Sequence, residues 1–125
     1  MKAIGLTRYL PIENPESLVD VEFDKPVASG RDILVKIHAI AVNPVDVKVR
    51  APKDGVEETP RILGWDAAGV VESVGTDVTL FSPGDEVYYS GDITRSGAYA
   101  EYQLVDERIV GRKPKTLGFA EAAAL

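Results

Sequence analysis

The sequence contains no cysteine and only one histidine, and these two absences limit the chemistry available to it. Without cysteine, neither a disulfide nor a thiolate metal ligand can form, and a single histidine excludes any site that needs two imidazole groups. Basic residues are also few, since 14 Lys and Arg stand against 20 Asp and Glu and leave a formal net charge of −6. This balance argues against a nucleic-acid partner or an anionic membrane partner, because both require clustered positive charge.

Long apolar runs are missing as well. The N-terminus has no apolar segment of signal-peptide length, and no stretch of the chain is long enough to span a bilayer. These features predict a soluble, cytoplasmic protein without a membrane partner. The chain has 125 residues, of which 45% are hydrophobic, and this size favours a single domain.

Short β-rich runs separated by Gly and Pro make up most of the chain. In the clearest run, residues 32–42, the side chains of Ile33, Val35 and Ile37 alternate and form one apolar face. The acidic stretch 54–58 is predicted to be a flexible loop. Close spacing of the runs indicates a mainly β barrel or sandwich with little helix. The other predicted strands are residues 1–9, 18–23, 66–74, 86–89 and 98–105.

Two short helices are predicted. Asn43 is suited to an N-cap and Pro44 to the first helical position, which indicates a helix over residues 44–50. Gly118 followed three residues later by Glu121 forms half of a capping box and predicts a helix that continues to Leu125. This second helix has neither a Gly C-cap nor a basic last turn, so we expect the chain to be a fragment of a longer protein.

Four sequence blocks, in this order, resemble the N-terminal catalytic domain of the medium-chain dehydrogenases/reductases. They are residues 36–46 (KIHAIAVNPVD), 62–75 (ILGWDAAGVVESVG), 83–87 (PGDEV) and 97–102 (GAYAEY). Within this superfamily, the stretch from Asn43 to Asp46 and the missing cysteines are similar to the zinc-independent quinone oxidoreductases and enoyl reductases. The resemblance implies a GroES-like, partly open β-barrel over residues 1–125. It also implies NADPH as hydride donor and a quinone or α,β-unsaturated carbonyl compound as substrate.

The resemblance also indicates where the zinc enzymes of the superfamily hold their metal. This chain has Asn43 where those enzymes have a ligand cysteine, Trp65 where they have a ligand histidine, and Asp66 where they have glutamate. An indole cannot ligate zinc, an amide is a poor ligand, and one carboxylate cannot replace the roughly four donors that zinc requires. We therefore expect no metal site, even though a zinc-type label could be attached to the sequence.

Hydride reduction needs a group that stabilises negative charge on oxygen, and a proton must follow. The Asn43 amide is the first catalytic candidate, because it can donate to a carbonyl oxygen or to the carboxamide of the cofactor; its helix-capping role is the structural alternative. Lys48 lies one helical turn after Pro44. It is either a cation that stabilises an enolate and donates a proton or part of a solvated helix face.

The remaining candidates have weaker chemical arguments. Asp46 is expected to orient the cleft, with direct acid–base work as the alternative. Trp65 and Asp66 are assigned to the substrate pocket, with core packing and local hydrogen bonding as their respective alternatives. His38, the single histidine, is expected to be structural. The tyrosines near the C-terminal end, including Tyr99, are interpreted mainly as sheet residues.

Three function classes remain in view. The leading one is the catalytic half of an NADPH-dependent, zinc-independent reductase, for which both a monomer and a homo-oligomer stay open. The others are a zinc-type alcohol dehydrogenase and a non-enzymatic module like the co-chaperonin GroES, which uses the same barrel. No Gly-x-Gly-x-x-Gly fingerprint occurs in the chain. NADPH is therefore expected to bind mainly to a Rossmann domain outside this chain. The residues of this chain do not indicate a preference for NADPH over NADH.

Overall fold

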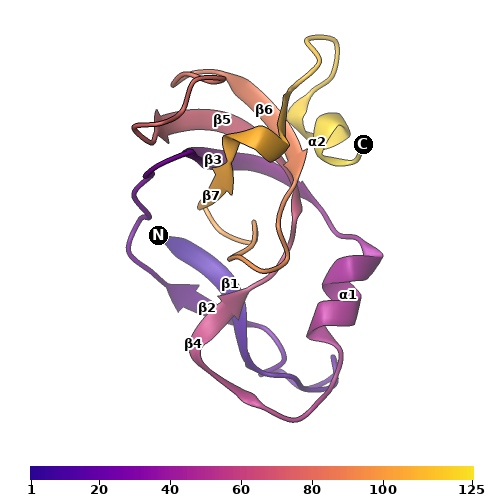
Figure 1. The fold of residues 1–125 in the computed structure, drawn as a ribbon. Coiled ribbons are helices and arrows are strands. Elements are labelled where there is room, and N and C mark those ends of the chain that lie inside the picture. The colour runs from indigo at the N-terminus through magenta and orange to yellow at the C-terminus, as the bar shows by residue number, and fades with distance from the viewer.

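All 125 residues are described by the computed structural model, which contains two β-sheets and two short α-helices (Figure 1). The smaller sheet has the strand order β2-β1-β4 and the larger one the order β7-β3-β5-β6-β8. The strands are β1 (Lys2–Arg8), β2 (Val19–Glu22), β3 (Asp32–Ala41), β4 (Val56–Ile62), β5 (Asp66–Val74), β6 (Glu86–Ser90), β7 (Tyr102–Asp106) and β8 (Val110–Arg112). The predicted mainly β, partly open fold is confirmed, because the two sheets do not close into a barrel.

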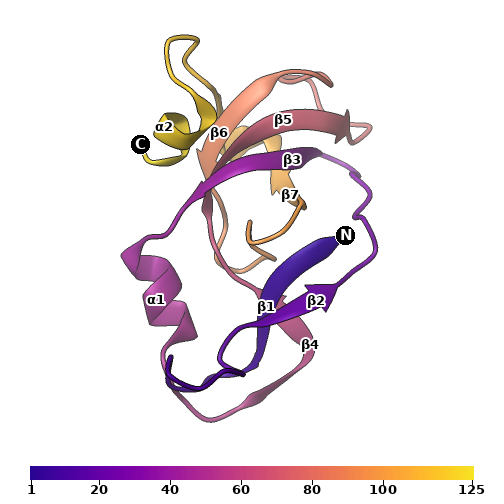
Figure 2. The ribbon, with the colours of Figure 1, turned by 180° about the vertical axis from the view of Figure 1, so that it is seen from behind.

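Both predicted helices are present, although the second ends at Ala123 and does not continue to Leu125 as predicted. Helix α1 (Pro44–Arg50) begins where predicted, with extended backbone at the N-cap Asn43 and Pro44 in the first turn. Helix α2 (Phe119–Ala123) packs on β3, β5 and β6, and a 3₁₀ turn, η1 (Glu107–Ile109), joins β7 to β8. Neither helix is long and apolar enough to cross a membrane. Seen from behind, β3 leads straight into α1, which runs down one side of the molecule toward the smaller sheet (Figure 2).

Two sequence predictions were wrong in detail. The acidic stretch 54–58 is not wholly a loop, because β4 begins at Val56 and pairs antiparallel with β1, with Arg8 opposite Val56. Hydrogen bonding to a neighbouring strand outweighs the low strand propensity of its glutamates. The predicted strand 98–105 begins only at Tyr102.

The segment just before β7 links the two sheets instead of extending one of them. Tyr99 donates its backbone N–H to the carbonyl of Leu63 (3.0 Å) and accepts from the N–H of Ile4 in β1 (2.8 Å). Its neighbour Glu101 accepts from the N–H of Ile37 in β3 (2.9 Å). Tyr99 is thus fixed at the junction between the sheets.

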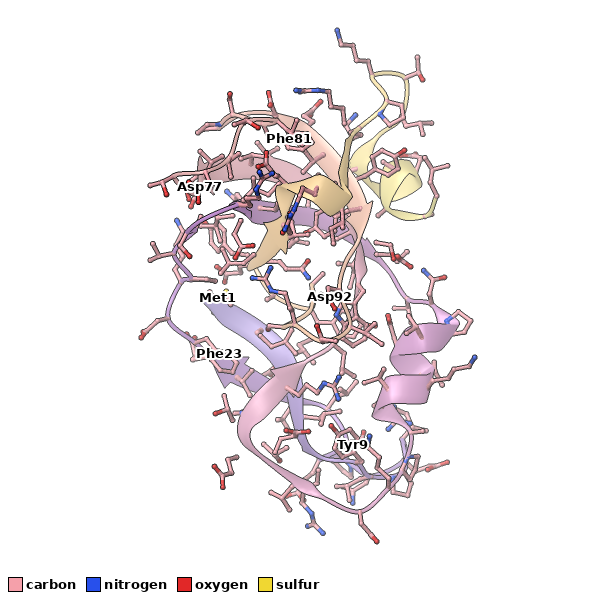
Figure 3. The ribbon with its side chains drawn as sticks, viewed as in Figure 1. Met1, Tyr9, Phe23, Asp77, Phe81 and Asp92 are labelled. Carbon is pink, nitrogen blue, oxygen red and sulfur yellow. The ribbon has the colours of Figure 1, made fainter.

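Each sheet has its own apolar core. Phe81 belongs to the nine-residue cluster of the larger sheet, whereas Tyr9 packs with Leu6, Leu63 and Trp65 at the smaller one. Phe81 and Tyr9 lie toward opposite ends of the molecule in Figure 3. The junction between these two cores is where β3 ends, α1 begins and β5 begins.

Candidate active site at the β3–α1–β5 junction

A hydrogen bond joins the residues that follow β3 and begin β5. The β3–β5 ladder ends with Ala41 opposite Asp66, so Asn43 emerges beside that carboxylate. The Asn43 side-chain amide donates through Nδ2 to Asp66 Oδ2. Because an ionised carboxylate can only accept, this contact fixes the orientation of the amide. Nδ2 makes no other hydrogen bond within the chain, which leaves its second N–H for an external acceptor.

Asp46 holds the start of α1 from inside the molecule. Its side chain is only 4% exposed, and its Oδ2 atom accepts from the backbone N–H of Asn43 (3.4 Å). The same oxygen accepts from the Tyr99 hydroxyl (2.6 Å), whereas Oδ1 is buried without a hydrogen-bond partner. The expected orienting role of Asp46 agrees with this position, and its role in catalysis stays a prediction.

Tyr99 is the site residue that the sequence argument missed. Its ring lies against Gly64, where a Cβ atom would come within 2.4 Å of the ring, and Gly64 has a φ of +91°. Burial, together with the hydrogen bond to Asp46, raises the pKa of the Tyr99 phenol well above its usual value. No local pattern links Tyr99 to Asp46, because the two are 53 residues apart.

Two predicted residues lie apart from this hydrogen-bonded group. Trp65 is 1% exposed and packs in the core of the smaller sheet, with its indole N–H directed to the carbonyl of Arg95 (3.4 Å). Lys48 is exposed on α1 and makes neither an ion pair nor a hydrogen bond. The structure therefore brings Asn43, Asp46 and Asp66 together, and it leaves Trp65 and Lys48 outside the group.

A hollow of about 830 Å³ lies beside α1. Asp46 and Tyr99 both line it, and 13 of its 19 lining residues, Tyr99 included, are hydrophobic. Asn43 and Asp66 are not part of its wall. Asp46 and Tyr99 therefore belong both to this wall and to the hydrogen-bonded group around Asn43.

The side chains of the chain do not assemble a metal site. No group of three or more His, Cys, Asp or Glu side chains is placed to hold an ion. The only histidine, His38, is exposed and stacks on Phe119, with ring centroids 4.4 Å apart. The two carboxylates near Asn43 are engaged with it, so the donors present do not fit zinc, which takes about four nitrogen, sulfur or oxygen ligands.

Comparison with known proteins decides the family. Residues 29–115 match the family described as the alcohol dehydrogenase GroES-like domain. The chain belongs to this family. The resemblance to the medium-chain dehydrogenases/reductases is thereby confirmed, because the relatives of this GroES-like domain are zinc-type alcohol dehydrogenase-like proteins and quinone oxidoreductases.

Two curated relatives illustrate these groups. A zinc-type alcohol dehydrogenase-like protein of Staphylococcus aureus is 47% identical over 125 residues, which are 100% of this chain and 37% of the relative. The quinone oxidoreductase of Mus musculus is 41% identical over 130 residues, covering 99% of this chain and 38% of the relative. The chain thus spans little more than a third of the length of these relatives.

Solved structures share the fold of this GroES-like domain. A candidate zinc-dependent alcohol dehydrogenase from Rhizobium etli has 57% identity and a TM-score of 0.94, covering 100% of this chain and 36% of that one. Escherichia coli quinone oxidoreductase in complex with NADPH has 26% identity and a TM-score of 0.83, covering 99% of this chain and 36% of that one. The chain therefore has the fold of one domain of these longer proteins.

Proposed function

We propose that this GroES-like domain is the substrate-binding and catalytic half of an NADPH-dependent, zinc-independent reductase of quinones or α,β-unsaturated carbonyl compounds. The observation that supports the proposal is the Asn43 amide, oriented by Asp66 and left with one free N–H. Similarity to quinone oxidoreductases, one of them in complex with NADPH, supports the substrate class and the cofactor.

The chemistry follows from the direction in which the amide points. When bound, NADPH supplies a hydride to a carbon of the substrate. Negative charge then develops on the substrate oxygen, and a fixed N–H donor lowers the energy of that state without having to reorganise. Asp66 occupies one N–H of Asn43, so the other is the group that donates to this oxygen.

The other candidates take supporting roles in this proposal. Lys48, whose ammonium is exposed and unpaired, is the proposed donor of the proton that completes reduction. Trp65 supports the pocket from the core side, and Asp46 orients Asn43. A nucleotide-binding domain outside these 125 residues is proposed to hold most of the cofactor, and the complete enzyme is proposed to combine both domains.

Replacing Asn43 tests the proposal in the complete enzyme. Asn43→Ala should lower kcat for NADPH-dependent quinone reduction by roughly tenfold to a thousandfold, the loss typical of removing one such donor. Asn14→Ala is the matched control, since Asn14 is the other asparagine of the chain and only accepts a turn hydrogen bond from Glu16. If Asn43→Ala lowers thermal stability but leaves turnover unchanged, Asn43 acts only as a helix cap and the proposal is wrong.

The names of the Staphylococcus aureus and Rhizobium etli relatives favour a second candidate, a zinc enzyme. The donor set around Asn43 argues against it, because it offers two carboxylates and an amide. We expect elemental analysis of the complete enzyme, purified with zinc in the medium and then dialysed, to find no zinc ion attributable to this domain. One zinc per chain that is lost in Asn43→Ala or Asp66→Ala would support the zinc enzyme instead.

A further inference from the structure

The contacts of Tyr99 lead beyond the proposed function and rest on it. We propose that Tyr99 is a positioning residue, which holds the Asn43 amide in its reactive orientation by fixing the carboxylate of Asp46. Tyr99 itself touches neither Asn43 nor Asp66 through any hydrogen bond. Its effect on catalysis therefore passes through Asp46.

The anchoring of Tyr99 is the first step. Its backbone N–H and C=O are bonded to Leu63 and Ile4, so its Cα is fixed by both the strand connection before β5 and strand β1. Its ring fills the space beside Gly64, which no residue with a Cβ could share. The hydroxyl is consequently directed to one place, and that place is Asp46 Oδ2 at 2.6 Å.

The second step is the shared oxygen. Asp46 Oδ2 accepts both the Tyr99 hydroxyl and the Asn43 backbone N–H, whereas Oδ1 has no partner. These two donors supply all the hydrogen bonds that hold the carboxylate. Loss of the hydroxyl would let the carboxylate turn toward water in the adjoining hollow, which Asp46 lines, and the contact to Asn43 would be lost.

The third step joins this contact to the amide. The backbone N–H of Asn43 donates to Asp46, and its side-chain amide donates to Asp66. A donor must lie within a few tenths of an ångström of its place to stabilise a transition state, so a small shift of the Asn43 backbone lowers the rate. Tyr99 thus sets the position of a group that it does not contact.

The experiment compares two tyrosines in the complete enzyme. Tyr99→Phe keeps the ring over Gly64 and removes only the hydroxyl. Tyr89→Phe is the matched control, because the buried Tyr89 hydroxyl donates to Gln103 (2.8 Å) and has no connection to Asn43. We expect roughly a tenfold lower kcat in Tyr99→Phe with an unchanged KM for NADPH, and a change within about twofold in Tyr89→Phe.

Two further measurements identify the route through Asp46. The ¹⁵N resonance of the Asn43 side-chain amide, assigned by its loss in Asn43→Ala, should shift in Tyr99→Phe and stay in place in Tyr89→Phe. Asp46→Asn, which keeps an acceptor for Tyr99, should also reduce kcat. The double variant with both Tyr99→Phe and Asp46→Asn should lose no more kcat than the more impaired of the two single variants. Fully additive losses, or equal kcat and an unshifted amide in Tyr99→Phe, would overturn the inference. Failure of the proposed function would instead show as unchanged kcat in Asn43→Ala.

Discussion

Asp46 and Glu107 are two buried carboxylates that the fold satisfies in different ways. Glu107 is fully buried, accepts two backbone N–H groups through Oε1, from Thr79 (3.0 Å) and Leu80 (2.8 Å), and lies 3.8 Å from the guanidinium of Arg31. Asp46 has no basic partner and depends on one tyrosine hydroxyl and one longer backbone contact. A carboxylate held by main-chain groups and a cation stabilises a loop, whereas one held by a side-chain hydroxyl can transmit a change to its neighbours.

The largest expected effect on stability comes from Glu107. Glu107→Ala leaves the N–H groups of Thr79 and Leu80 without their acceptor, and it removes two charge-assisted hydrogen bonds. We expect a loss of about 3 kcal/mol or more in the free energy of unfolding, measured by urea denaturation with circular dichroism. Turnover per folded molecule should not change, since Glu107 lies apart from Asn43. A loss below about 1 kcal/mol would show that water replaces the carboxylate easily.

Replacing Asp46 should lower stability less, and turnover more, than replacing Glu107. Asp46→Ala removes the acceptor of the Tyr99 hydroxyl and of one longer backbone contact, so we expect a smaller stability loss of about 1 to 2 kcal/mol. The fall in kcat should exceed that of Glu107→Ala, because Asn43 loses its backbone contact. Equal losses of stability in the two variants, with full turnover per folded molecule in both, would contradict the expected difference between Asp46 and Glu107.

The sequence was sufficient to predict α1 and its N-cap, because Asn43 and Pro44 are local signals that do not depend on the rest of the fold. It also placed Asn43 and Asp66 in one candidate site, through family position. It could not place Tyr99, since a contact across 53 residues is set by how the segment before β7 joins the two sheets. It also missed β4, whose acidic residues form a strand only because β1 offers a pairing edge.

The smallest expected effect is a loss of stability at alkaline pH. It distinguishes Asp46, which has a tyrosine partner, from Glu107, which has none. Burial, with the hydrogen bond to Asp46, raises the pKa of Tyr99, so the folded chain keeps this proton at a pH where the unfolded chain releases it. The stabilising contribution is complete below about pH 10, the usual tyrosine value, and declines as the pH rises further. Glu107 has no tyrosine among its partners, which are two backbone N–H groups and an arginine.

Urea unfolding at several values between pH 8 and pH 11.5 measures this effect. Tyr99→Phe should show a shallower alkaline loss of stability than the parent chain, because it lacks the group with the raised pKa. Tyr89→Phe should also be shallower, since burial raises the pKa of Tyr89. Glu107→Ala should follow the parent slope. Identical slopes for Tyr99→Phe and the parent would mean that the Tyr99 phenol ionises as freely as in the unfolded chain.

The burial of Trp65 has an optical consequence. It is the only tryptophan of the chain, its indole is shielded from water, and it directly precedes Asp66. All indole emission from these 125 residues therefore arises next to one strand of the candidate site. Reduced nicotinamide absorbs light in the range where a buried indole emits, so the proposed cofactor, bound near Asn43, would quench this fluorescence by energy transfer. The domain thus contains its own label for following how a cofactor or a neighbouring domain approaches Asn43.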